Sequence, residues 1–318
     1  MNLRFWLTKT RIWLRNLLTA RVRNHRRNRA FSQARSPFAE FLEPRLLLTG
    51  GHTGSTNDPG EFYYSLVSGT HVYDSDHSRI WADDSDIVKL TIDDDGSWEH
   101  EIFFDGSDVG LSHWKEDIKA FTIRDNGSIL ISTSGTTSVP GVHYAGGGDL
   151  LQFTPTSTGR HTAGTWEMYV DGSDLGISHW ENIDAVAELP DGRLMISNQE
   201  NGNLNGLGYV RGQDLSVLTL TSTGYRTRGS WQRYLDGSDV GLTSWSENID
   251  GVSISGDGST IHLSPRGTAY VPGVKAYDED VFVSYKKNEE WTAPESIGDN
   301  INTKGHDAAI ALSVDGQT

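Results

Sequence analysis

Carboxylates recur in a fixed pattern along this 318-residue chain, around a decapeptide that is written three times. The copies read DGSDVGLSHW at 105–114, DGSDLGISHW at 171–180 and DGSDVGLTSW at 236–245. Each copy, together with the residues just after it, places four acidic side chains on one glycine-containing stretch. The full set is Asp105, Asp108, Glu116, Asp117, Asp171, Asp174, Glu181, Asp184, Asp236, Asp239, Glu247 and Asp250. Because Ca²⁺ accepts about six to eight oxygen ligands in loose geometry, the pattern makes these carboxylates candidate calcium ligands.

The alternative hypothesis for these carboxylates is structural, and the sequence favours it. Asp-Gly and Ser-Asp pairs form turns in which an Asp side chain accepts backbone N–H groups. No D-x-D-x-D-G loop with a closing Glu is intact in the repeats; TIDDDGSWE at 91–99 has Thr91 where the first Asp should stand. We therefore expect a structural corner that requires no cofactor. Bound calcium would instead make the melting temperature fall with EDTA and recover with added Ca²⁺.

A tryptophan ends each decapeptide, at the same offset from its first Asp: Trp114, Trp180 and Trp245. These tryptophans follow a strand-like segment and fall in a loop. On one rim of the molecule they would offer stacking platforms for sugar rings or for a partner protein. The alternative is packing between repeats, because large aromatic side chains are usually well buried. A second series opens a strand-like element and is expected in the core: Trp98, Trp166, Trp231 and Trp291.

Four short elements rich in β-branched and aromatic residues must position these side chains in each repeat. The first element covers 84–91, 147–154, 212–219 and 278–285, and the second begins at the strand-opening tryptophans. The third element covers 118–123, 183–189 and 249–254. The fourth covers 127–133, 192–198 and 258–264. Asn-Gly or Asp-Gly stands between the third and fourth elements, a strong hairpin signal in which both turn residues need positive φ. We predict that each unit is a four-stranded antiparallel meander.

Such a unit cannot cover both faces of its own sheet, and no helical pattern is long enough to cover it. Radial stacking in an all-β propeller, with a repeat of about 65 residues, buries those faces and leaves short edges. The predicted domain covers 61–318, with repeats at about 84–133, 147–198, 212–264 and 278–318. Four blades are visible. The sequence also suggests that residues 62–67, which resemble ILISTSG, supply the outer strand of the last blade beside 310–314 and close the ring.

The first 50 residues differ from the rest of the chain in their charge. Residues 1–50 hold 11 of the 27 basic residues and two of the 43 acidic ones, and no apolar run there reaches the length of a membrane span. LEPRLLLTG at 42–50 resembles the LEPR-XLL segment of large bacterial surface and secreted proteins, which implies export to the cell surface or beyond. The alternative is a basic amphipathic or nucleic-acid-binding arm. Residues 51–60 read as a linker.

The repeats carry a second resemblance. Units one to three resemble the DGSDVGL-type propeller repeats of bacterial secreted proteins, and residues 278–318 are similar to a TolB-type propeller repeat, with a W-x-x-P-E loop and an I-N-T turn. Both resemblances imply the propeller fold, and a fold alone implies no activity.

Charge and motifs narrow the function. Outside residues 1–50 the chain is strongly acidic, which disfavours nucleic acid and anionic membrane as partners. The sequence contains no G-x-S-x-G, P-loop, G-x-G-x-x-G or H-E-x-x-H motif. We expect an exported or cell-surface scaffold that binds a protein or a glycan without catalysis. The alternative is a secreted propeller hydrolase or lyase that acts on polysaccharide with central carboxylates.

Overall fold

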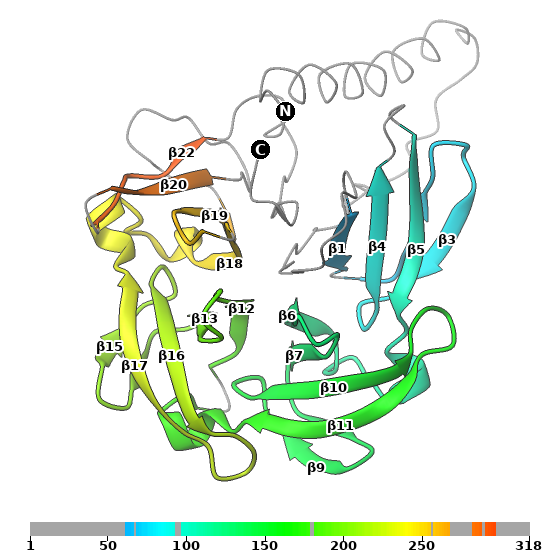
Figure 1. The fold of residues 1–318 in the computed structure, drawn as a ribbon, viewed down its shortest axis with the longest axis horizontal. Helices are drawn as coiled ribbons and strands as arrows, with labels where there is room; N and C mark the ends of the chain where they lie inside the picture. The colour runs from blue at the N-terminus through cyan, green and yellow to red at the C-terminus, as the bar shows by residue number, and fades with distance from the viewer. Residues whose placement is uncertain are drawn as a thin grey trace, which may run out of the picture.

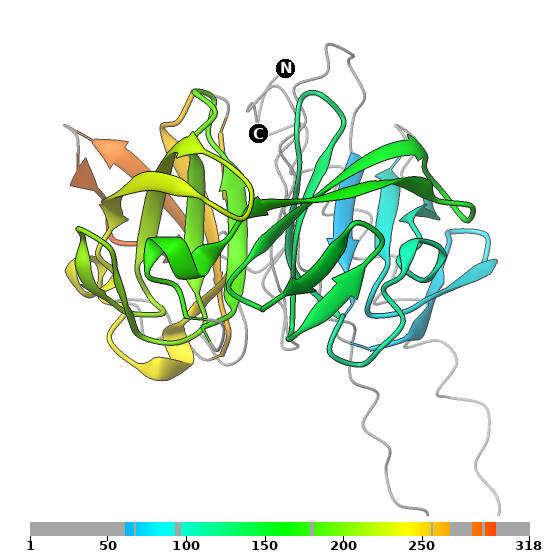
Figure 2. The same ribbon diagram turned by 90° about the horizontal axis from the view of Figure 1, so that it is seen from below.

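Four antiparallel sheets stand around a central axis in the computed structural model, as Figure 1 shows. The structure describes residues 61–66, 68–92, 97–178, 181–255, 257–267, 282–287 and 290–296. The innermost strands of neighbouring sheets contact one another beside the axis, and Figure 2 views the same ring from the side. This arrangement confirms the predicted four-bladed, all-β propeller. No helix in the ranges just given is long and apolar enough to cross a membrane.

The second and third sheets are complete blades of four strands each. From the axis outward, the second runs β6 (Ile118–Ile123), β7 (Ile129–Thr133), β10 (Leu150–Ser157) and β11 (Ala163–Val170). The third runs β12 (Ile183–Glu188), β13 (Leu194–Asn198), β16 (Leu215–Ser222) and β17 (Arg228–Leu235). The inner strands are buried along almost their whole length, because both faces of each blade are covered by its neighbours.

The first and last sheets are built from the two ends of the described chain. The first has the order β1 (Glu61–Ser65), β4 (Ile87–Ile92) and β5 (Trp98–Phe104). The last has the order β18 (Ile249–Ile254), β19 (Thr260–Pro265), β20 (Phe282–Lys287) and β21 (Glu290–Trp291), with β22 (Glu295–Ser296) also paired to β20. Residues 1–60, which include the predicted targeting segment and linker, lie outside the described residues.

The blade differs from the predicted unit by half a repeat. The two predicted hairpins of each unit exist: β6 pairs with β7, and β10 pairs with β11. However, β7 pairs laterally with β10 of the following unit, with Ile131 opposite Leu151. The expectation that one unit makes one blade is therefore wrong. Each complete blade joins the last two elements of one unit to the first two of the next, and the decapeptide connects neighbouring blades.

The turn between the two inner strands of each blade also differs from the prediction. Gly127 and Gly192 have φ of 79° and 81°, whereas the preceding Asn126 and Asp191 do not have positive φ. Asn126 instead accepts a hydrogen bond from the backbone of Ser128 through Oδ1, at 2.9 Å. The hairpins are confirmed, but only the glycine adopts the left-handed conformation.

Strand β1 belongs to the first sheet and not to the last blade, where it was predicted. It pairs antiparallel with β4, placing Tyr64 opposite Val88. Its expected partner, 310–314, lies outside the part of the chain that the structure describes, so closure of the ring by that pairing stays a prediction. The resemblance to ILISTSG nevertheless found the correct position, because β1 pairs with β4 as β7 pairs with β10.

A small hairpin is inserted before the third strand of the second and third blades, and before β4, which has the corresponding place in the first sheet. These are β2 (Thr70–Tyr73) with β3 (Arg79–Ala82), β8 (Thr137–Val139) with β9 (Val142–Ala145), and β14 (Gly202–Leu204) with β15 (Gly208–Val210). By the antiparallel topology, these hairpins lie at the end of each sheet where the inner strand begins. The decapeptide loops 105–117, 171–182 and 236–248 reach the same end. We call these hairpins and loops together the hairpin rim.

Candidate functional site

The first Asp of each decapeptide stands just before a short 3₁₀ helix, and Asp171 and Asp236 are the N-cap residues of the second and third helices. The helices are η1 (Ser107–Val109), η2 (Gly172–Leu175) and η3 (Gly237–Val240). Asp105, Asp171 and Asp236 each accept hydrogen bonds through Oδ1 from the backbone N–H and the hydroxyl of the serine two residues later. Such caps satisfy donors that the helix start leaves open. Bonds from Ser238, with a smaller contribution from Arg233, hold the pKa of Asp236 below its usual range.

A buried Asp that the sequence analysis missed fixes the decapeptide glycine in every described copy. Asp149 accepts from the backbone N–H of Gly172 at 2.8 Å and from that of Gly146 at 2.7 Å. Asp86 and Asp214 make the equivalent bonds to Gly106 and Gly237. These three aspartates precede the third strand of each blade and are at most 9% exposed. The sequence contains their signal, because each first element carries an Asp just before its apolar residues.

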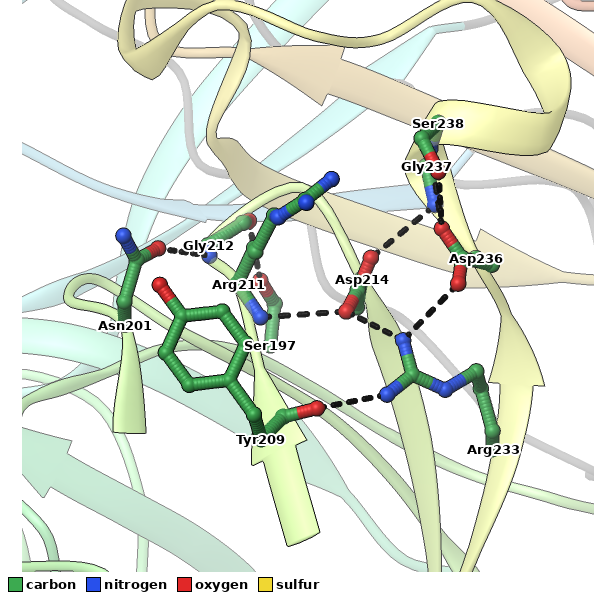
Figure 3. Close-up of polar contacts among 10 residues, drawn as sticks. All are labelled: Ser197, Asn201, Tyr209, Arg211, Gly212, Asp214, Arg233, Asp236, Gly237 and Ser238. Carbon is green, nitrogen blue, oxygen red and sulfur yellow. Dashed lines mark hydrogen bonds and ion pairs between the residues drawn. The ribbon is translucent and has the colours of Figure 1, made fainter. Parts of the chain in front are cut away.

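The third blade adds an arginine to this network, as Figure 3 shows. Arg233 donates to Asp214 at 2.5 Å, to Asp236 at 3.1 Å and to the backbone carbonyl of Tyr209 at 2.6 Å. One guanidinium thus joins the buried Asp, the decapeptide and the inserted hairpin. The backbone that presents Tyr209 is held in place by charge-assisted hydrogen bonds.

The glutamates after the decapeptide hold the backbone just before the tryptophan position. Glu116 accepts from the backbone N–H groups of Ser112 and His113 at 2.8 Å, and Glu247 accepts from those of Thr243 and Ser244 at 2.6 Å. Glu181 does the same for Ser178 at 2.6 Å. Sequence reasoning made these glutamates candidate metal ligands, and the structure places them as loop anchors.

Two of these anchors are almost fully buried: Glu116 is 8% exposed and Glu247 1%. Burial acts to raise the pKa of Glu116, but the hydrogen bonds from Ser112, Thr137 and His113 outweigh it and hold that pKa below its usual range. The carboxylate therefore stays ionised at neutral pH. Ser244 and Glu247 form a reciprocal capping box around the short helix η4 (Trp245–Glu247).

The second Asp of each decapeptide, at its fourth position, faces solvent. Asp108, Asp174 and Asp239 are all exposed, although Asp108 also accepts from the backbone of Thr162 at 3.0 Å. The remaining three candidates, Asp117, Asp184 and Asp250, lie at the starts of the inner strands. The twelve carboxylates thus have four different places: at the starts of the 3₁₀ helices, within the loops as hydrogen-bond acceptors, on the exposed rim, and at the starts of the inner strands.

Calcium binding stays a prediction. Among the described residues, no group of three or more His, Cys, Asp or Glu side chains stands close enough together to hold a metal ion. The first Asp and the Glu of each copy already accept backbone hydrogens of their own loop. This geometry favours the structural corner that the sequence analysis preferred.

The repeat changes its chemistry near the axis. The second residue of the inner strand is Lys119 in the second blade but Asp184 and Asp250 in the next two, and Lys119 Nζ lies 3.1 Å from Asp184 Oδ1. Two residues earlier stand Asp117, Asn182 and Asn248. Burial, with the nearby charge of Asp84 adding to it, raises the pKa of Asp117 to about 6. The four-residue pattern E-D-I-K thus replaces the E-N-I-D of the other two copies.

The rim tryptophans are exposed where the structure describes them. The exposed fraction is 72% for Trp114 and 78% for Trp245, so neither packs between blades. Trp180 lies outside the described residues. In the second tryptophan series, Trp166 and Trp231 are buried as predicted, but they lie inside β11 and β17 and do not open these strands. Trp291 is partly buried, and the side chain of Trp98 is outside the described set.

A third aromatic series on the same rim escaped the sequence analysis. Trp81, Tyr144 and Tyr209 occupy matching positions in the inserted hairpins and are 52%, 54% and 53% exposed. Each stands five residues before the buried Asp of its blade, and this constant offset would have identified the series. Where the structure describes it, the hairpin rim therefore presents exposed rings from both the inserted hairpins and the decapeptide loops.

Comparisons with known proteins find only distant structural similarity. No family model matches the sequence, and no curated protein matches it. A putative 6-phosphogluconolactonase from Bacteroides uniformis is 9% identical over 79% of this chain and 70% of that chain, with a TM-score of 0.32. Virginiamycin B lyase from Staphylococcus aureus is 8% identical over 81% and 74%, with a TM-score of 0.32, and the Dos1 propeller is 9% identical over 80% and 72%, with a TM-score of 0.30. At these scores none of them bears on the function.

Proposed function

We propose that this chain is an exported, non-catalytic propeller that binds a protein or glycan ligand on its hairpin rim. The observation that carries the proposal is the pairing of an exposed tryptophan with a buried glutamate in one loop. Trp114 and Trp245 face solvent, while Glu116 and Glu247 fix the backbone immediately before each ring.

Exposure of these rings is costly unless a partner covers them. Full burial of a large apolar side chain stabilises a fold by roughly 1.5–3 kcal/mol. The free protein does not gain this stabilisation at either described rim tryptophan. A loop already fixed by hydrogen bonds loses little conformational entropy when a ligand binds, so more of the contact energy appears as affinity. Exposed rings on rigid loops are therefore suited to recognition.

Export rests on the sequence resemblances. LEPRLLLTG at 42–50 resembles a segment of bacterial surface and secreted proteins, and the DGSDVGL and TolB-type repeats resemble those of secreted propellers. The absence of cysteine in the chain is compatible with an oxidising exterior. Fractionation of the native host, with antibody detection of the chain in medium, surface and cytoplasm, tests this part directly.

A hydrolase or lyase is the second candidate, and Asp117 is the observation that favours it. A carboxyl group with a pKa of about 6 is suited to exchange protons near neutral pH. It stands close to the acidic Asp84 and on the strand of Lys119, near the axis where the repeat changes. If this candidate is correct, Asp117→Asn abolishes turnover of a polysaccharide substrate while binding survives.

One experiment separates these functions. The purified full-length chain is tested for binding to glycan and peptide panels and for turnover of model glycosides. The Trp114→Ala/Trp245→Ala variant should bind roughly tenfold more weakly, whereas Tyr225→Ala should leave the affinity unchanged. Tyr225 is the matched control because it is 55% exposed but lies in the turn between β16 and β17. An affinity that is unchanged in the double variant contradicts the rim proposal, and turnover contradicts the absence of catalysis.

A further inference from the structure

We infer that the ligand of the hairpin rim is an uncharged polysaccharide whose sugar rings stack on the exposed aromatics of successive blades. This inference rests on the proposed rim function and adds the chemical class of the ligand. Both described aromatic series contribute one ring per blade: Trp81, Tyr144 and Tyr209 in the hairpins, and Trp114 and Trp245 in the decapeptide loops. A surface that repeats one contact suits a ligand that repeats one unit.

The exposed rings are common to both described decapeptide loops, whereas the basic side chains beside Trp114 have no counterpart beside Trp245. Near Trp114 stand Lys115, with Nζ 5.1 Å from the ring centroid, and the ring of His113, 5.4 Å away. Trp245 has Ser244 and Ser246 as its chain neighbours instead. A ligand that binds both loops in the same way must therefore use the ring faces and hydrogen bonds, which is how a neutral sugar binds aromatic residues.

Charge excludes the polyanionic alternatives. Each decapeptide exposes its second Asp, six residues before its tryptophan position, so Asp108, Asp174 and Asp239 spread negative charge along the described part of the rim. Such a surface repels nucleic acids and sulfated or uronic-acid glycans. A basic polypeptide is disfavoured at the first loop, because Lys115 already lies over the ring that would attract a cation.

The repeated rings also predict how the affinity depends on the length of the polysaccharide. A single stacked ring contributes only a modest free energy, so one sugar on one blade binds weakly. Rings on several blades engaged by one chain raise the effective concentration of each further contact. A long polysaccharide should therefore bind much more tightly than a disaccharide of the same sugar.

The test is affinity electrophoresis of the full-length chain in gels that contain hydroxyethyl cellulose, glucomannan or xyloglucan, with polygalacturonate and heparin as anionic arms. We expect retardation by at least one neutral polymer and by neither anionic one. Trp114→Ala/Trp245→Ala should weaken that binding roughly tenfold, and Tyr225→Ala should not change it. Circular dichroism confirms that each variant is folded.

The outcomes distinguish this inference from the proposed function. Rim-dependent binding of a basic peptide, with no retardation by any neutral polymer, overturns the glycan class and leaves the rim function intact. Retardation that the double variant retains overturns both. Retardation by heparin or polygalacturonate alone also overturns the inference, because the charge argument would then be wrong.

Discussion

Tryptophans with the same repeat period have opposite environments in two regions of the propeller. At the junctions between blades, Trp166 and Trp231 are 7% and 8% exposed, and their indole Nε1 atoms donate to the backbone carbonyls of Val109 and Leu175, both at 3.0 Å. On the hairpin rim, Trp114 and Trp245 are more than two-thirds exposed. Repetition of a residue within the chain therefore does not by itself indicate a structural role.

This difference indicates that the contacts at the junctions between blades stabilise the fold. Each buried indole joins its own blade to the 3₁₀ helix that precedes it, and backbone bonds such as Gly159 N–H to Phe103 C=O and Gly224 N–H to Tyr169 C=O repeat the same junction. The rim rings make no comparable contribution to the described junctions. The fold thus depends on the first region, and the second is free to serve recognition.

Trp231→Ala should have the largest effect on stability. Truncation removes a buried ring and its hydrogen bond to Leu175, and large-to-small changes of this kind cost about 3–5 kcal/mol. Urea unfolding followed by circular dichroism measures the loss, with Trp166→Ala as the equivalent change one junction earlier. A loss below about 1 kcal/mol at both positions would remove the basis of the comparison.

Asp149→Ala should have the next largest effect, about 2–3 kcal/mol, because it leaves the backbone N–H groups of Gly172 and Gly146 without their buried acceptor. The matched control is Asp174→Ala, an exposed Asp of the same loop, which should change the stability by less than about 0.5 kcal/mol. Equal losses for the two variants, measured by the same urea titration, would show that the buried Asp is not what holds the decapeptide.

Asp117→Asn should stabilise the protein at neutral pH by about 1 kcal/mol, after allowance for solvent screening. The pKa of Asp117 is raised to about 6 in the folded state, by burial first and then by the charges of Asp84 and Asp83. Ionisation of Asp117 therefore destabilises the folded state. The destabilisation is complete above pH 6 and absent below the pKa of about 4 that an Asp has in the unfolded chain. The gain should be present at pH 7.5 and vanish at pH 4 in thermal melts.

Asn182→Asp is the reciprocal variant at the next junction. Asn182 donates through Nδ2 to the carbonyl of Ser134 at 3.2 Å and to Gln199 at 3.1 Å, and an ionised carboxylate cannot donate. We expect a loss of stability at pH 7.5 that diminishes on acidification. A gain for Asp117→Asn that is the same at every pH would mean that charge is not its cause.

The smallest effects on stability should come from the rim. Trp114→Ala/Trp245→Ala should alter the free energy of unfolding by less than about 0.5 kcal/mol per site, since both rings are mostly in solvent. EDTA should likewise leave the melting temperature unchanged, because the capping carboxylates accept hydrogen bonds from their own loops. A melting temperature that falls with EDTA and recovers with Ca²⁺ would establish the calcium hypothesis instead.

Sequence reasoning found the strands but assigned the blade boundaries half a repeat away. Each hairpin with a short turn was predictable, because Asn126-Gly127 and its counterparts stand between apolar runs. The lateral neighbours were not, because the connections 105–117 and 134–149 are similar in length and neither is a tight turn. Strand periodicity says which face is buried and does not say which strand lies alongside.

The candidate site was predicted only in part. The rim tryptophans were identified from their constant offset, but the twelve acidic residues look alike in the sequence although the structure gives them different environments. Glu116 and Asp117 are adjacent, yet hydrogen bonds lower the pKa of the first while burial raises that of the second. Such differences depend on which donors surround a carboxylate, and those donors come from segments distant in the chain.

The most direct test of the rim as the ligand-binding surface is hydroxyl-radical footprinting of the full-length chain, with and without a saturating neutral polysaccharide such as glucomannan. Oxidation of Trp114 and Trp245 should fall severalfold in the complex, because stacked sugar rings cover side chains that are exposed in the free protein. Oxidation of Tyr225, which is also exposed but lies in the turn between β16 and β17, should not change. Unchanged oxidation of both rim tryptophans in a complex shown to have formed would contradict the account.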